Sequence, residues 1–325
     1  MTLPKAEIHC HIEGATPPAL ARQKAAQHGI ATDGLITPDG ESYVASDFTG
    51  FLAAYDRVVK LFRTPEDFSD LSYAHYTSIA RDGAIYAEIF LSPDQADSAG
   101  LSYADYLTGL ADGLARASAE TGIIGRFIPC AIRHLGAENA ERAAREIVTH
   151  PHQWVTGFGL AGDERVHQPA DFVRAFAIAG EAGLALTAHA GEVCGAESVR
   201  AALDALPVRR IGHGVRAIED PDLVRRIAGE GIVLEVCPGS NVALGVAPVL
   251  KSHPLPLLMA AGVRVTINSD DPPFFRTSLS HEYDSVAATL GLDAAAMRSF
   301  TRTAIEAAFI DQPTRNMLLS RLSGD

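Results

Sequence analysis

The sequence predicts an α/β fold, a (β/α)8 TIM barrel with extra helices inserted after the first strand. Eight short β-rich runs recur along the 325 residues, with helical segments between them. Several runs are apolar almost throughout, as expected for parallel strands that helices cover. Eight strand–helix alternations fit a barrel better than a doubly wound sheet, which stays open as an alternative. No Gly-x-Gly-x-x-Gly motif follows the first run to support that alternative.

The strands are expected, in chain order, at residues 6–12, 84–91, 124–132, 155–161, 184–190, 208–213, 232–237 and 263–269. Between them, helix starts and stops can be recognised. Asp220 is suited to cap a helix that has Pro221 at its first position, and Gly229 or Gly231 lies near the end of that helix. Thr64-Pro65 opens another helix in the same way.

The segment from 14 to 81 is too long for one barrel helix, so we expect several extra helices there, within a single domain spanning 1–325. One of them carries apolar residues at helical spacing: Phe51, Tyr55, Val58, Val59 and Phe62. Such a stripe either packs onto the scaffold or forms a lid over the barrel mouth. A lid is possible as an interpretation because the insertion follows the C-terminal end of the first strand, which is the end where the barrel mouth lies.

Composition limits the class of protein and of partner. Hydrophobic residues make up 47% and charged residues 21%, which is ordinary for a globular protein. The formal net charge of −13 would repel a phosphate backbone or an anionic membrane, so we expect a small-molecule partner and no nucleic acid or membrane. The chain shows no signal-peptide pattern and no run of 18 apolar residues, so we expect a cytoplasmic protein. The oligomeric state is not predicted.

The four cysteines lie far apart, at Cys10, Cys130, Cys194 and Cys237. No Cys-x-x-Cys pair occurs, which argues against a thiolate zinc site and against a disulfide framework. Buried free thiols are the expected state.

Four polar clusters lie at or near the ends of predicted strands: His9-Cys10-His11, His189-Ala190-Gly191-Glu192, Gly212-His213-Gly214 and Ser269-Asp270-Asp271-Pro272. Barrel enzymes place their active sites at the C-terminal ends of the strands. Because side chains alternate along a strand, His9 and His11 are expected to share a face. Histidines and paired acids at the ends of buried strands require something that neutralises them, so together the clusters predict a metal site.

The types of ligand suggest zinc, one ion per chain. His9, His11 and His189 supply nitrogens and Asp270 supplies an oxygen, which leaves room for a water molecule. Magnesium would require mostly oxygen ligands, whereas iron, cobalt or manganese stay open. The predicted fourth strand contains no lysine that could bridge two metal ions.

These residues carry a resemblance to the adenosine/adenine deaminase family of the amidohydrolase group. The matching motifs run along nearly the whole chain in order, as LPK before HCHIEG, then GFGLAGDE, HAGE, IGHG, CPGSN and NSDDP. The cytidine-deaminase type of zinc site does not fit, because it requires a Pro-Cys-x-x-Cys motif.

The resemblance implies roles for individual residues. His9, His11, His189 and Asp270 would bind zinc. Glu192 would donate a proton to N1 of a purine, and His213 would orient the attacking water and stabilise the charge that develops beside it. Asp271 would share a hydrogen bond with N7, Gly162 would offer its backbone N–H to N3, and His11 and Glu13 would also contact the substrate.

Each of three residues also has a purely structural interpretation. Glu192 could cap the following helix, His213 could be a packed strand-end histidine, and Asp271 could be a turn acid before two prolines.

The resemblance implies hydrolytic deamination of a 6-aminopurine nucleoside or nucleobase. Adenosine-specific members carry Asp near the ribose where this chain has Glu13, which points to the adenine branch. Three other motifs point to the adenosine branch: GLAGDE, the glycine of IGHG and the SPD that follows the second strand. We therefore expect adenosine and deoxyadenosine first. The alternatives are adenine, an N6-modified adenine or another adenine-bearing metabolite, an amide or ester substrate, and a non-catalytic purine- or metal-binding barrel.

Overall fold

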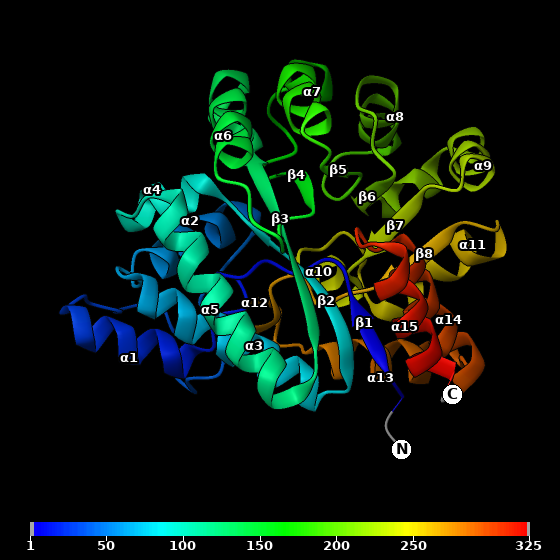
Figure 1. The fold of residues 1–325 in the computed structure, drawn as a ribbon. Helices are drawn as coiled ribbons and strands as arrows, with labels where there is room; N and C mark the ends of the chain where they lie inside the picture. The colour runs from blue at the N-terminus through cyan, green and yellow to red at the C-terminus, as the bar shows by residue number, and fades with distance from the viewer. Residues whose placement is uncertain (1–2, 324–325) are drawn as a thin grey trace.

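The computed structural model describes residues 3–323, and its eight strands form one parallel sheet in sequential order. Figure 1 shows the strands at the centre with helices around them, which is the (β/α)8 barrel that the sequence predicts. The strands are β1 Lys5–Glu7, β2 Ala84–Leu91, β3 Ile124–Ile132, β4 Gly157–Ala161, β5 Ala185–Ala190, β6 Arg210–His213, β7 Val233–Val236 and β8 Arg264–Ile267.

The first strand is shorter than expected, because regular pairing ends at Glu7 instead of near residue 12. Its register already shifts between Lys5 and Ala6, an irregularity that bends a strand and breaks its alternation. Beyond Glu7 an isolated bridge between Cys10 and Asp270 joins the chain to the segment after β8, and the backbone N–H of Asp270 donates to the carbonyl of His9. This bridge brings the first and last metal-ligand candidates together as the barrel closes.

Three helices occupy the connection between β1 and β2: α1 Pro18–His28, α2 Phe48–Val59 and α3 Pro65–Arg81. In Figure 1 they lie on one side of the barrel. The helix that the apolar stripe predicts is α2, which begins three residues earlier than the stripe and ends at Val59. Phe62, the last residue of the stripe, lies beyond the end of this helix. Thr64 caps α3 through a complete capping box, with Pro65 at the first helical position.

The remaining α-helices follow the later strands: α4 Pro93–Ala99, α5 Tyr103–Thr121, α6 Ala137–Thr149, α7 Val173–Glu181, α8 Ala196–Ala205, α9 Pro221–Glu230, α10 Pro238–Ala243, α11 Leu255–Ala260, α12 Pro272–Phe275, α13 Leu279–Leu290, α14 Ala294–Ala307 and α15 Gln312–Ser323. Short 3-10 helices are η1 Arg133–Leu135, η2 Pro169–Phe172, η3 Val215–Glu219 and η4 Leu250–Ser252. Asp220 caps α9 as predicted, and the helix ends at Gly231 in the left-handed conformation. Within residues 3–323, no helix combines the length and the apolar character that crossing a bilayer requires.

Buried charges extend from the barrel interior to the candidate site. Arg210 is 1% exposed, and its guanidinium lies 2.5 Å from Glu88 and 2.6 Å from Glu235. Glu235 in turn lies 2.7 Å from Nδ1 of His9. Because a buried charge requires a partner, this chain fixes the Glu235 carboxylate and, through it, the His9 ring.

A second buried charge anchors the inserted helices. The Asp67 carboxylate on α3 lies 3.0 Å from the Lys24 ammonium and 2.7 Å from Nε2 of His28, and it accepts the backbone N–H groups of Arg63 and Thr64. Although burial opposes ionisation, these contacts lower the pKa of Asp67. The ion pairs therefore favour the folded state wherever Asp67 is ionised.

We expect Asp67→Asn to lower the free energy of unfolding by about 3 kcal/mol at neutral pH, because it leaves the buried Lys24 ammonium without this partner. Since the pKa of Asp67 is depressed in the folded state, the stabilisation is complete above about pH 4 and disappears as the pH falls through the folded pKa. Urea unfolding from pH 7 to pH 3 should therefore show a shrinking difference from the parent protein. Asp70→Asn is the matched control, because Asp70 also contacts Lys24 but is 43% exposed, and it should cost less than about 1 kcal/mol. A pH-independent loss in Asp67→Asn would contradict the prediction.

Candidate active site

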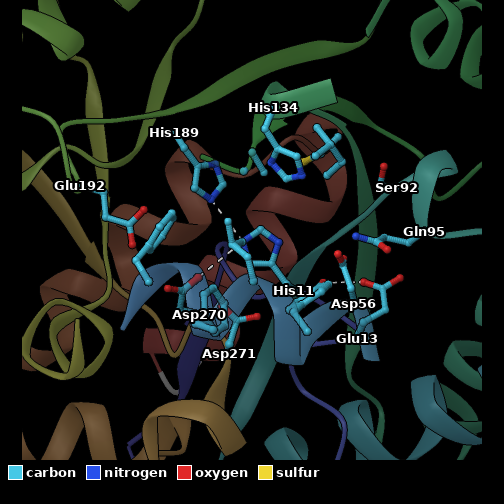
Figure 2. Close-up of a pocket in the computed structure, with 18 of the residues that line it drawn as sticks. His11, Glu13, Asp56, Ser92, Gln95, His134, His189, Glu192, Asp270 and Asp271 are labelled. Atoms are coloured by element: carbon cyan, nitrogen blue, oxygen red, sulfur yellow. Dashed lines mark hydrogen bonds and ion pairs between the residues drawn. The ribbon is translucent and has the colours of Figure 1, made fainter. Parts of the chain in front are cut away.

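A pocket at the C-terminal ends of the strands brings the predicted residues together. Its lining includes eight of the nine: His11, Glu13, Gly162, His189, Glu192, His213, Asp270 and Asp271. The ninth, His9, is fully buried, and its ligand nitrogen lies within 4.8 Å of those of His11 and His189. Figure 2 shows Glu192 and Glu13 on opposite sides of the pocket, with His11, His189 and Asp270 between them.

Three imidazoles and one carboxylate converge at the base of the pocket. Nε2 of His11 lies 3.2 Å from Nε2 of His189. Oδ1 of Asp270 lies 3.4 Å from Nε2 of His9 and 3.5 Å from Nε2 of His11. Nitrogens and a carboxylate oxygen at such separations suit a single zinc-type ion.

The hydrogen bonds around the imidazoles support this fit. Nδ1 of His9 is held by Glu235 and Nδ1 of His189 by the carbonyl of Leu160, at 2.7 Å and 2.9 Å, so both rings present Nε2 to the same point. Nε2 of His9 is buried and has no hydrogen-bond partner among residues 3–323. A buried polar atom without a partner is costly unless a ligand satisfies it, and outer-sphere partners of this kind orient metal-binding histidines.

The electrostatics of the site favour a cation. Burial lowers the pKa of His11 to about 4, which leaves that ring neutral and able to coordinate a metal. Although burial alone would lower the pKa of His9, the Asp270 and Glu235 carboxylates raise it to about 9. The carboxylates therefore favour positive charge at Nε2 of His9, where a divalent ion would lie.

Glu192 and His213 face each other beside the three imidazoles. Nε2 of His213 lies 3.7 Å from Oε2 of Glu192 and 4.0 Å from Oδ2 of Asp270. Burial, together with the negative charge of Asp270, raises the pKa of Glu192 well above its ordinary value, so its protonated form is favoured. Burial lowers the pKa of His213 to about 3, which keeps its ring neutral.

Two of these residues adopt backbone conformations that are uncommon for side chains other than glycine. His213 has a φ of +57° and Asp270 a φ of +63°. Residues in the left-handed region persist where the surrounding structure fixes them, often at functional sites. His213 is the last residue of β6, Asp270 follows the end of β8 by three residues, and both side chains line the pocket.

Asp271 is buried, and its Oδ1 has no hydrogen-bond partner in the part of the chain that the structure describes. A Cβ at Gly14 would lie 1.6 Å from that oxygen, so only glycine allows the first connection to pass this carboxyl group. Burial and the adjacent Asp270 raise the pKa of Asp271. Asp271 also lines the pocket, which places its carboxyl group beside a bound ligand.

Glu13 closes the other side of the pocket. Its carboxylate accepts hydrogen bonds from the hydroxyl groups of Tyr106 and, at 2.8 Å, Tyr55. Tyr55 lies on α2 and Tyr106 on α5, so two elements hold the Glu13 side chain in place. Burial raises the pKa of Glu13, and the two phenol hydrogen bonds oppose that rise.

Glu164 holds the loop that carries Glu192, a role that was not predicted from the sequence. One carboxylate oxygen accepts the N–H groups of Glu192, Val193 and Cys194, and the other accepts from Gly191 and Ser198. The GDE motif contained this glutamate, but nothing in the sequence indicated that it faces a loop 27 residues away. Tyr106, Arg133 and Glu235 were missed as well; Arg133 donates to the carbonyl of His189 at 2.8 Å.

We expect Glu164→Gln to lower kcat/KM by about 10²-fold, because a single amide oxygen cannot accept five donors and the Glu192 loop moves. Unfolding in urea should show a loss of about 1–3 kcal/mol. The neighbouring Asp163→Asn is the control, since the Asp163 side chain pairs only with Arg165 among the contacts described and makes no hydrogen bond to the Glu192 loop. Equal kinetics in the two variants would argue against this role for Glu164.

Comparison with known proteins agrees with this geometry. Residues 4–324 match the family model described as adenosine deaminase. An adenine deaminase of Mesorhizobium japonicum is 57% identical over 320 residues, 98% of each chain, and one of Sinorhizobium medicae is 55% identical over the same share.

Solved structures give the same result. The crystal structure of an adenine deaminase from Arthrobacter aurescens superposes with a TM-score of 0.93 at 32% identity, covering 99% of this chain and 98% of that one. An amidohydrolase from Burkholderia ambifaria with bound Zn gives a TM-score of 0.87 at 26% identity, covering 100% and 93%.

The matched length, the barrel and the convergence of polar residues at its mouth all point the same way. The chain belongs to the adenosine deaminase family and is a hydrolytic deaminase of the metal-dependent amidohydrolase type.

Proposed function

We propose that this enzyme deaminates adenine, converting it with water to hypoxanthine and ammonia. The relatives at 50–57% identity are named adenine deaminases, so they do not support the expectation that adenosine is the main substrate, and they support the adenine alternative. The observation that carries the proposal is the buried Glu13 carboxylate, fixed by two phenols opposite Glu192.

A nucleobase differs from its nucleoside at N9, which bears a hydrogen in adenine and a sugar in adenosine. N1 and N9 lie at opposite ends of the purine, as Glu192 and Glu13 do in the pocket. With its two phenol donors in place, the Glu13 carboxylate still has lone pairs for a ring N–H. A ribose would leave this buried acceptor unpaired and would compete for its space.

The small size of the pocket supports the same choice. Its cavity volume of about 80 Å³ is well below the 300–1,000 Å³ of pockets for drug-sized ligands. Phe51 and Tyr55 of α2 line it. We propose that this helix is the lid that separates the nucleobase from solvent.

In the proposed reaction, zinc is held by His9, His11, His189 and Asp270, and when bound it acts as a Lewis acid that makes water nucleophilic at neutral pH. Protonated Glu192 donates its proton to N1 as the water oxygen bonds to C6. His213 orients that oxygen, Asp271 shares a hydrogen bond with N7, Gly162 donates to N3, and His11 contacts the ring. The two protons of the attacking water complete the balance: one passes to the C6 amino group, which leaves as ammonia when the C6–N bond breaks, and the other returns Glu192 to its protonated form. A 6-oxopurine that keeps the N1 proton remains.

The test compares turnover of adenine, adenosine and deoxyadenosine by the zinc-loaded enzyme, followed by the change in ultraviolet absorbance. We expect kcat/KM for adenine to exceed that for adenosine by about 10⁴-fold, because a site built around a substrate N–H rejects an analogue that lacks it. Glu13→Asp should narrow this ratio by shortening the side chain, and Tyr55→Phe should narrow it less. A preference for adenosine would overturn the proposal, and turnover of none of the three would favour an amide or ester substrate or a binding protein.

A further inference from the structure

Two buried polar side chains, His253 and Asn241, form a row that connects the backbone N–H of Leu255 to the ring of His213. His213 ends β6, Asn241 lies in α10, and His253 follows η4. All three are at most 3% exposed. The sequence analysis assigned no role to Asn241 or His253, yet their hydrogen bonds determine which nitrogen of His213 carries the proton.

The direction of the row is set at its far end. The backbone N–H of Leu255 lies 3.1 Å from Nδ1 of His253. A backbone N–H can only donate, so Nδ1 of His253 accepts this hydrogen bond and carries no hydrogen. Burial lowers the pKa of His253 to about 4, so its ring is neutral at neutral pH and its single proton is on Nε2.

The Asn241 amide lies between the rings of His253 and His213. Nε2 of His253 donates to Oδ1 of Asn241 at 3.0 Å, which fixes the orientation of the amide. Its Nδ2 then faces Nδ1 of His213 at 3.4 Å. An amide nitrogen donates and does not accept, so Nδ1 of His213 is the acceptor. A ring nitrogen that accepts a hydrogen bond carries no hydrogen, so the hydrogen-bond geometry places the ring proton of His213 on Nε2.

We propose that Asn241 and His253 are positioning residues that hold the proton of neutral His213 on Nε2. This nitrogen faces Glu192 and Asp270, at 3.7 Å and 4.0 Å from their nearest carboxylate oxygens. His213 therefore offers the attacking water a hydrogen-bond donor and does not take a proton from it. The left-handed backbone at His213, with φ of +57°, keeps the ring between Asn241 and the pocket.

The assignment of the proton can be tested without catalysis. In the zinc-loaded enzyme labelled with 15N-histidine, the difference from the spectrum of His213→Gln identifies the two nitrogens of His213. We expect Nδ1 to have the chemical shift of an unprotonated ring nitrogen and Nε2 that of a protonated one. The opposite pattern would overturn the proposal, whatever the substrate proves to be.

Variants of Asn241 then test the consequence for the reaction, which rests on the proposed function. In Asn241→Asp the carboxylate can only accept from His213, so the proton should move to Nδ1 and kcat should fall by about 10²–10³-fold, with KM and zinc content little changed. Asn241→Leu, of similar volume, should show a mixture of both tautomers and an intermediate kcat. A merely structural role would give similar losses in both variants, without the reversed nitrogen shifts.

His253 offers a conservative rescue. His253→Gln keeps an N–H donor for Asn241, so its nitrogen shifts and kcat should stay near those of the parent enzyme, whereas His253→Leu should resemble Asn241→Leu. Unchanged shifts and kcat in Asn241→Asp would contradict the proposal. If the variants do not fold, the spectrum of the parent enzyme still decides. Absence of adenine turnover would count against the proposed function and would leave the proton assignment standing.

Discussion

Glu192→Gln is expected to lower kcat for adenine by about 10²–10⁴-fold, the usual contribution of a positioned general acid. Burial raises the pKa of Glu192, so the parent enzyme has a carboxylic acid ready to protonate N1. Glutamine has nearly the same shape and can donate a hydrogen bond, but it cannot transfer a proton. Binding of the purine should therefore survive while the chemical step slows.

The measurement is steady-state and single-turnover kinetics, combined with metal analysis and thermal unfolding. Zinc content and Tm should match those of the parent enzyme, because Glu192 is not among the four proposed ligands and is 5% exposed in a loop that Glu164 holds. Glu197→Gln is the matched control and should keep full activity, because Glu197 is an exposed residue in the first turn of α8. Turnover within a few-fold of the parent in Glu192→Gln would remove this residue from the role of acid.

Removal of the metal is expected to have the other large effect. Dialysis against a chelator should abolish deamination and lower stability, because binding to the folded state alone contributes about 4 kcal/mol when free metal is at 1,000 times its Kd. The structural reason is the cluster itself: Nε2 of His9 is buried without a hydrogen-bond partner, and two histidines face each other at 3.2 Å. Added zinc should restore both activity and Tm.

A ligand variant separates loss of the ion from damage by the chelator. His11→Ala should lose both bound metal and activity without any chelator, and added zinc should not restore the activity of this variant. His150→Ala is the control, since His150 is an exposed histidine at the C-terminal end of α6, outside the pocket lining and outside the clusters of side chains that could hold a metal. Full activity of the parent enzyme after measured loss of all metal would contradict the prediction.

Most of the barrel could be read from the chain because its signals are local. Apolar runs separated by capped helices predicted all eight strands, and Asp220 and Thr64 cap the helices they were expected to cap. The first strand was the exception. Alternation predicted a strand to residue 12, but closure of the barrel imposes a bulge near Lys5 and a bridge at Cys10, and both depend on β2 and on the segment after β8.

In the site, too, some residues could be predicted from sequence motifs and others only from the folded structure. Motif order was enough to select His9, His11, His189 and Asp270, because residues that follow parallel strands share one end of the barrel. The residues whose hydrogen bonds hold the site in place have no recognisable motif in the sequence. Glu164 and Asn241 act across 28 residues on partners that only folding brings near.

The sequence by itself determined the barrel, its polar mouth and the family, since periodicity, caps and strand-end motifs are properties of neighbouring residues. Only the tertiary structure decided which groups surround the residues of the barrel mouth. Two phenols hold Glu13, Glu235 lies against Nδ1 of His9, and the Asn241 amide lies against Nδ1 of His213. The physical reason is that a buried polar group takes its character from the partners around it. Those partners come from distant segments, and nothing local encodes their direction.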